Sequence, residues 1–247
     1  MLNKLEQYYQ SKGILSTNFT CPHKDRCSSD CKAFTGPKSA FVSTGFEANH
    51  LPRLLFLSLD SGSGEVNDHN RLPLAVRQQN EVDRDTLTLH KHKHWYRTHE
   101  LAWYILRRFK PELAVEDAKH YFAHANSAKC CMNKKQKKKA DRILFKHCQE
   151  YLGEELAILN PKIIITQGNE AKFGIERFRE QTLKVLDQFA QTIELNGKPV
   201  FWLHTYHPNN WGAFNRQRNF DKENQIARGW ITYSDMIYEF VNQKSEQ

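Results

Sequence analysis

Short apolar runs that alternate with amphipathic segments constrain the fold of this chain most strongly. The apolar runs cover residues 53–59, 121–128, 162–166 and 200–203. Segments with helical periodicity cover residues 94–109, 140–159 and 224–241, and Gly168 opens another. This alternation indicates a three-layer α/β/α fold with a mainly parallel central sheet. We expect a single domain over residues 1–247, with an N-terminal cysteine-containing extension at roughly residues 1–35.

Three segments outside these runs carry separate predictions. Asn196-Gly197 is a turn signal between two strand-like runs and predicts a hairpin. Residues 1–20 are typical of a short polar helix, Leu2–Ser11, followed by a segment with little capacity to form core. Residues 67–93 are polar and aperiodic, which predicts a lid or a substrate-facing loop.

The charge balance favours an anionic partner. The chain has 36 Lys and Arg against 28 Asp and Glu, a formal net charge of +8, and such a charge attracts phosphates. It has no apolar run of about eighteen residues and no signal-peptide core. We therefore expect a soluble, intracellular, cytoplasmic protein that is a monomer and has no membrane partner.

Six cysteines lie in two groups, which favours metal ligation over disulfides. Cys21, Cys27 and Cys31 share one polar segment, and Cys130, Cys131 and Cys148 follow much later. Thiolates are ligands for soft metals. The alternative is a set of idle thiols in a loop, although free cysteine is usually buried.

Polar residues follow three of the apolar runs. Asp60 follows the first, Asn126 lies near the end of the second, and His207-Pro208 follows the last. Parallel strands end at one sheet edge, so a carboxylate, an amide and an imidazole are expected to share one pocket. Such a set suits cleavage of a bond to a nucleobase. Each residue alone is also typical of a turn or a cap.

Two basic stretches suit nucleic acid. Residues 91–97 mix cations with His94, Trp95 and Tyr96, and such a mixture can stack a base and hold phosphates. Five lysines lie within six positions at Lys134, Lys135, Lys137, Lys138 and Lys139. Without their neighbours, these lysines would indicate only a solvated charged face.

The joint pattern resembles the uracil-DNA glycosylase superfamily, most closely its iron–sulfur branch, often called family 4. Residues 126–130, NSAKC, are followed by a basic stretch, Cys148, a helix and the run NPKIIITQGNEA at 160–171. This order is similar to the branch's N-x-x-K-C…C…P-K pattern, and TYHPN at 205–209 is similar to its T-Y-H-P-S motif. The resemblance covers roughly residues 21–215.

The resemblance implies a hydrolase that removes uracil or a related deaminated base from DNA, as in base excision repair. By position it implies catalytic roles for Asp60 and His207. It implies base contacts from Leu59, Asn126, Trp95 and Tyr96. The implied DNA contacts are the five lysines, Pro208, Asn209 and Arg216.

The resemblance also implies a structural [4Fe–4S] cluster on Cys27, Cys31, Cys130 and Cys148, with Cys21 and Cys131 as alternates. Zinc is the alternative metal. The first motif, at residues 58–62, lacks the family's leading Gly and its Pro. A second functional class is therefore a protein of the same fold that binds damaged or single-stranded DNA without turnover.

Overall fold

A computed structural model describes residues 1–29, 31–62, 64–82, 93–134, 141–208 and 229–243. Its centre is a seven-stranded sheet in the order β2-β4-β3-β6-β9-β8-β7. Neighbouring strands among β4, β3, β6 and β9 are parallel, whereas β2, β8 and β7 pair antiparallel with their neighbours. The strands are β2 (Phe41–Val42), β4 (Phe122–Ala128), β3 (Leu54–Asp60), β6 (Ile163–Gln167), β9 (Lys198–Thr205), β8 (Ala190–Leu195) and β7 (Gln181–Val185). The α/β prediction is confirmed, and the sheet is mixed, with a parallel centre.

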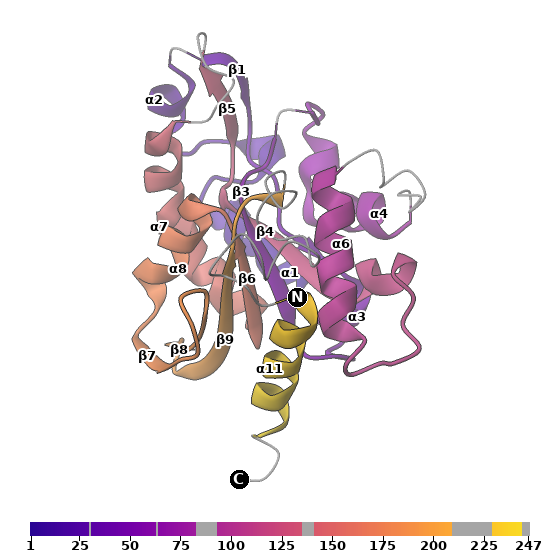
Figure 1. Ribbon diagram of the computed structural model, residues 1–247. Helices are drawn as coiled ribbons and strands as arrows, with labels where there is room; N and C mark the ends of the chain where they lie inside the picture. Colours follow the sequence, from indigo (N-terminus) through magenta and orange to yellow (C-terminus); the bar gives the residue numbers. More distant parts are fainter. Residues whose placement is uncertain (30, 63, 83–92, 135–140, 209–228, 244–247) are drawn as a thin grey trace.

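Helices cover both faces of the sheet, as Figure 1 shows. On one face α1 (Leu2–Ser11), α7 (Arg142–Leu159) and α8 (Asn169–Phe178) build one hydrophobic core cluster. On the other face α4 (Pro73–Glu81), α6 (Lys93–Leu106) and α11 (Trp230–Asn242) build a second. The described residues also form shorter helical turns: η1 (Ser16–Asn18), α2 (Lys24–Ser28), α3 (Thr44–Glu47), η2 (His69–Arg71) and η3 (Glu116–His120).

The alternation of side chains along β3 explains the two cores. Leu55 and Leu57 belong to the cluster on the α7 face, and Leu54 and Phe56 belong to the cluster on the α6 face. All four are fully buried. A strand covered on both faces has no polar side, which is why its sequence is a continuous apolar run.

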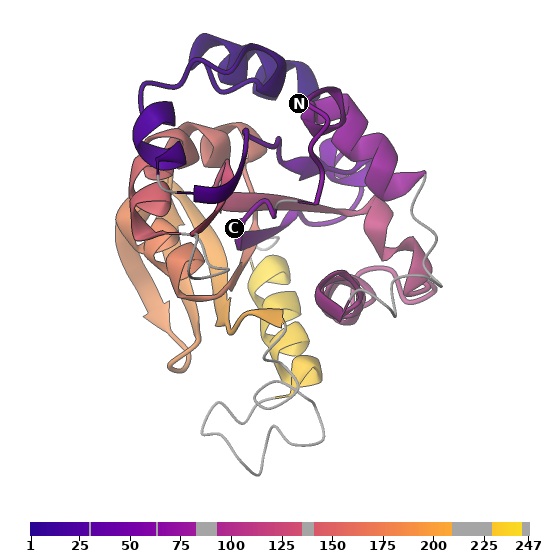
Figure 2. The ribbon, with the colours of Figure 1, turned by 90° about the horizontal axis from the view of Figure 1, so that it is seen from above.

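The N-terminal segment contributes more to the core than its sequence predicted. Leu2, Leu5, Tyr8 and Tyr9 of α1 are buried against the α7 face. Figure 2, seen from above, shows this helix lying along the outside of the domain. The predicted helix Leu2–Ser11 is confirmed, but it is not uniformly polar, because two leucines and two tyrosines form an apolar stripe at helical spacing. The following segment, which was expected to contribute little core, also buries Ile14 in the same cluster.

Residues 67–93 also differ from their prediction. Pro73 begins the nine-residue helix α4, which buries Val76 and Asn80. Proline is favourable in the first turn of a helix because its missing N–H is not needed there. The predicted loop is thus partly helical, and residues 83–92 lie outside the described residues.

Two local features hold the sheet in its observed form. Asn196 and Gly197 have positive φ angles of 51° and 66° and join β8 to β9, which confirms the predicted hairpin. Gly168 follows β6 with φ 104°, and a Cβ there would lie 3.0 Å from the Leu59 side chain. Glycine at this position lets Leu59 reach the end of the sheet.

A second, two-stranded sheet was not predicted. Strands β1 (Cys31–Thr35) and β5 (Cys131–Lys134) pair antiparallel and extend beyond the main sheet beside α2 (Figure 1). This pairing joins the two cysteine-bearing segments, with Cys31 opposite Lys134 and Cys131 opposite Thr35. Among the described residues, no helix combines the length and apolarity needed to cross a membrane.

Candidate active site

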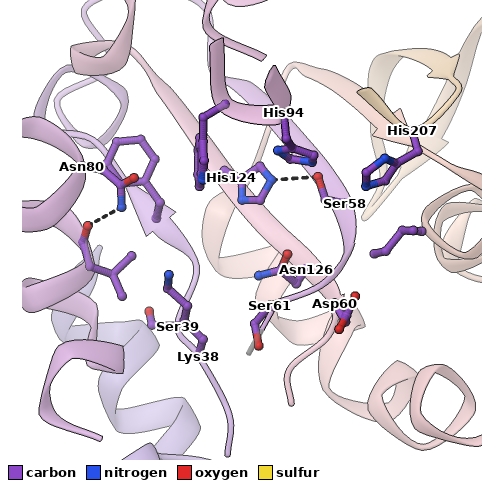
Figure 3. Close-up of a pocket in the computed structure, with 15 residues that line it drawn as sticks. Lys38, Ser39, Ser58, Asp60, Ser61, Asn80, His94, His124, Asn126 and His207 are labelled. Atoms are coloured by element: carbon purple, nitrogen blue, oxygen red, sulfur yellow. Dashed lines mark hydrogen bonds between the residues drawn. The ribbon is translucent and has the colours of Figure 1, made fainter. Parts of the chain in front are cut away.

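A cavity of about 280 Å³ lies at the carboxyl ends of the parallel strands. Figure 3 shows side chains from several elements around it. The residues that line it are Lys38, Ser39, Phe41, Ser58, Leu59, Asp60, Ser61, Gly62, Val76, Asn80, His94, Trp95, His124, Asn126 and His207.

The structure brings the three predicted strand-end residues into this one cavity. Asp60 is the last residue of β3, Asn126 lies within β4, and His207 follows β9. Ser58 of β3 lies opposite Asn126 of β4 in the sheet, and Asp60 follows two residues after Ser58. Asn126 is only 6% exposed, and no described residue forms a hydrogen bond with its side chain. Its amide can therefore pair with a planar ligand edge.

His207 sits on a turn that α6 holds in place. The Arg97 guanidinium donates a hydrogen bond to the Pro208 carbonyl oxygen. Burial lowers the pKa of His207 below its ordinary range, and the negative charge of Asp60 opposes part of this shift. The ring centroid of His94 lies 5.1 Å from that of His207. The cavity thus presents a neutral imidazole at neutral pH, close to a carboxylate.

A directed chain of hydrogen bonds runs beneath the cavity. Thr98 Oγ1 donates to the His94 carbonyl oxygen (3.0 Å), so it accepts from Gln167 Nε2 (3.0 Å). Gln167 Oε1 then accepts from Ser58 Oγ. Because Ser58 has one hydroxyl proton, its contact of 2.7 Å with His124 Nε2 requires that nitrogen to donate. The chain connects α6, β6, β3 and β4 and fixes the His124 ring.

An aromatic wall stands beside this chain. The rings of Trp95 and His124 have centroids 4.9 Å apart, and both residues line the cavity. Tyr96, the neighbouring candidate for base stacking, is not among the described residues that line it. Of these two candidates, only Trp95 lines the cavity among the described residues.

The opposite wall comes from residues that the sequence did not single out. On this side the cavity is lined by Lys38 from residues 36–40, the segment before β2 that we call the strap. Phe41 of β2 and Asn80 of α4 also line it. Asn80 is 2% exposed and donates Nδ2 to the Val76 carbonyl oxygen at 2.7 Å. The only local signal was Gly36-Pro37, a turn that leads into Lys38.

The chain matches the family model of the uracil DNA glycosylase superfamily over residues 32–230, most of its length. It belongs to that superfamily. A search of curated proteins found no match. The superfamily implies a hydrolase that cleaves N-glycosidic bonds in DNA. The match is to the superfamily as a whole, so the iron–sulfur branch remains a prediction.

Most of the predicted DNA contacts of this superfamily member cannot be placed. Lys135, Lys137, Lys138, Lys139, Asn209 and Arg216 lie outside the described residues. Lys134 is the last residue of β5, and Pro208 is buried next to His207.

Cysteines from both sequence groups gather at one end of this uracil DNA glycosylase fold. Cys27, Cys130 and Cys148 are buried in a common cluster with Leu144 and Phe145. Partly buried Cys31 packs against the same cluster, and Cys131 is buried in β5. The six cysteines are free thiols.

The thiols influence one another's pKa values. Burial, followed by the charges of Cys148, Cys21 and Cys31, raises the pKa of Cys27 to about 11. Burial raises the pKa of Cys130 as well, and Cys148, Cys21 and Cys27 add to it. Cys21 therefore acts on both of these thiols, although its own Sγ lies 3.1 Å from Tyr151 Oη.

A metal cluster fits this region by donor chemistry. Four soft sulfur donors within one apolar shell are the ligands that iron–sulfur clusters use. As the described side chains stand, no three His, Cys, Asp or Glu residues are grouped tightly enough to hold a single metal ion.

Proposed function

We propose that this protein hydrolyses the N-glycosidic bond of uracil or a related deaminated base in DNA, as a step of base excision repair. The observation that carries the proposal is the convergence of Asp60, Asn126 and His207 on one cavity at the carboxyl ends of β3, β4 and β9. Superfamily membership supports the same reaction class.

The amide of Asn126 would read the base. One oxygen acceptor and one N–H donor match the imide edge of uracil, which offers an N–H next to a carbonyl. The extruded base would stack on Trp95, with Leu59 at its edge. A base that stays paired in the duplex cannot enter such a cavity, so extrusion precedes chemistry.

The acid and the imidazole would act on opposite sides of the breaking bond. As the bond to the sugar breaks, its electrons pass to the base and positive charge develops on the sugar. Asp60 would stabilise that charge, orient the water whose oxygen adds to the sugar carbon, and accept the proton that this water loses. Neutral His207 donates a hydrogen bond to the carbonyl oxygen of the departing base.

Release of bases from labelled oligonucleotides tests this function. We expect excision of uracil, with hypoxanthine and xanthine as comparison substrates and thymine as the control base. Asp60→Asn should lower the rate about 10²- to 10⁴-fold, whereas Asp117→Asn, an exposed acid of η3, should leave it unchanged. If the unmutated protein binds uracil-containing DNA and never cleaves it, a damage-sensing role replaces the enzymatic one.

We further propose that Cys27, Cys130 and Cys148 hold a [4Fe–4S] cluster with a fourth cysteine. Cys31 completes the set by sequence resemblance, and Cys21 is supported by its electrostatic effect on Cys27 and Cys130. When bound, the cluster would supply a structural cross-link between α2, the end of β4 and α7.

Iron content after anaerobic purification tests the cluster and its fourth ligand. About four iron atoms per chain and a brown colour are expected, whereas zinc alone would exclude an iron–sulfur cluster. Cys21→Ser should lose iron if Cys21 is the fourth ligand, and Cys31→Ser should then keep it. The reverse result assigns Cys31.

The proposed partner is DNA that contains uracil or another deaminated base, bound by a monomer in the cytoplasm. Lys38 lines the cavity and the net charge is +8, so phosphates are attracted to the protein. Six free thiols suit a reducing compartment.

A further inference from the structure

Arg71 has an unusual environment for an arginine. Only 1% of the residue is exposed. Its guanidinium donates to the Gly36, Pro37 and Glu65 carbonyl oxygens and to Ser61 Oγ, at distances of 2.5, 3.1, 2.6 and 2.8 Å respectively. Four of the five N–H donors of the guanidinium are thus used, which offsets the cost of burying its charge.

These acceptors belong to two segments that border the cavity from different parts of the chain. Gly36 and Pro37 lead into Lys38 and Ser39, which line the cavity. Ser61 follows Asp60 directly, and Glu65 lies at the far end of the same loop. The Arg71 backbone adds a further link, because its carbonyl oxygen accepts from Ser39 N at 3.0 Å.

The acceptors of Arg71 are all neutral. No ion pair among the described residues includes Arg71. Its guanidinium therefore holds backbone and hydroxyl oxygens in place rather than neutralising a carboxylate. Burial lowers the pKa of Arg71, and the nearby acidic groups Cys130, Cys131, Asp68 and Glu65 oppose the shift. The fork of the guanidinium can bridge two segments at once, which a lysine ammonium on a flexible stem cannot do equally well.

We propose that Arg71 is a positioning residue of the active site, clamping the loop after Asp60 to the Gly36–Pro37 strap. This inference rests on the proposed glycosylase function. The clamp fixes Ser61, and through it the carboxylate of Asp60, against the wall that carries Lys38. Misplacement of a reacting group by about 1 Å can cost about 10²-fold in rate.

The test compares Arg71→Lys with Arg77→Lys. Arg77 lies on α4, donates Nε to the Val42 carbonyl oxygen at 2.7 Å and pairs with Glu47, without lining the cavity. It is therefore a matched arginine whose hydrogen bond and ion pair do not involve the loop after Asp60. Single-turnover release of uracil and DNA affinity are measured for both variants, together with amide hydrogen exchange of the peptide that spans Ser61 and Glu65 without DNA.

We expect Arg71→Lys to lower the release rate from saturating DNA about 10- to 100-fold, with DNA affinity within about threefold and faster exchange in the loop peptide. Arg77→Lys should change neither quantity. Equal rate losses in both variants, or a loss of affinity with an unchanged rate, would overturn the clamp.

Ser61→Ala supports the test if Arg71→Lys folds poorly. It removes one acceptor of the guanidinium and leaves the backbone acceptors in place. Its rate should fall, and Arg71→Lys should cost less in the Ser61→Ala background than in the unmutated protein. If the unmutated protein releases no base, the proposed function fails, and loop exchange alone then decides whether Arg71 is a clamp.

Discussion

Ser58 Oγ lies 2.7 Å from His124 Nε2, and its single hydroxyl proton is donated to Gln167 Oε1. The Nε2 atom of His124 must therefore carry a proton, and a neutral His124 then has an unprotonated Nδ1. We expect long-range nitrogen–proton NMR spectra of the protein to show this tautomer for His124 near neutral pH.

Ser58→Ala should remove the preference of His124 for this tautomer, because the acceptor that selects it is gone. The control is Ser234→Ala, which removes a buried hydroxyl of α11 that donates to Trp230 O at 2.6 Å. A His124 spectrum that is identical in the unmutated protein and in Ser58→Ala would show that Ser58 does not select the tautomer.

The strand-end residues could be predicted because their signal is local. Asp60 and His207 each follow a continuous apolar run, and parallel strands end at a common edge. The opposite wall could not be predicted in this way. Phe41 belongs to a two-residue strand, and Asn80 to a helix whose polar composition resembles a loop. Both positions depend on tertiary packing, which no local period records.

The buried ion pair of Lys129 and Glu155 also could not be predicted from the sequence. Lys129 is 1% exposed and pairs with Glu155, which is fully buried and also accepts from Tyr9 Oη. These residues lie far apart in the chain, and lysine is rarely buried without a partner. The sequence pattern placed Lys129 next to Cys130, but it carried no sign of the partner on α7.

The Lys129–Glu155 ion pair predicts a stability effect. Glu155→Gln leaves a buried ammonium without its counter-charge, so the free energy of unfolding should fall by roughly 3–5 kcal/mol. For a chain of this size, the melting temperature should fall by roughly 10 °C. Glu154→Gln changes the exposed neighbour and serves as the control. Equal melting temperatures for the two variants would contradict the assigned importance of the pair.

His207 predicts a pH dependence of catalysis. Because burial lowers its pKa below the ordinary value of about 6.5, the neutral form of the ring predominates from pH 6.5 to 8. His207→Asn should therefore lower the single-turnover rate of base release at every pH in this range, by a factor that does not increase toward pH 6.5. The rate of the unmutated protein is divided by that of His207→Asn at each pH, which removes the effect of other groups that titrate in both proteins. A ratio that grows toward pH 6.5 would instead assign the activity to the protonated ring.

His204 predicts a loss of stability in acid that is independent of activity. Burial, assisted by the positive charge of Lys172, lowers the pKa of His204 to about 4. Its side chain is 8% exposed, and Nδ1 lies 3.1 Å from Thr166 Oγ1. Between the unfolded pKa of about 6.5 and the folded value, only the unfolded chain takes up the proton. Stability from this residue is therefore complete above pH 6.5 and is lost as the pH falls toward 4, by roughly 3 kcal/mol.

Urea unfolding at pH 7 and pH 4.5 measures this loss. In His204→Asn the free energy of unfolding should depend less on pH than in the unmutated protein, because the residue that binds a proton only when unfolded is gone. His69→Asn, at an exposed position of η2, should keep the pH dependence of the unmutated protein. If His204→Asn and His69→Asn lose the same free energy between the two pH values, the acid sensitivity arises from other groups. In that case the pKa of His204 would be similar in the folded and unfolded states, and burial would not lower it.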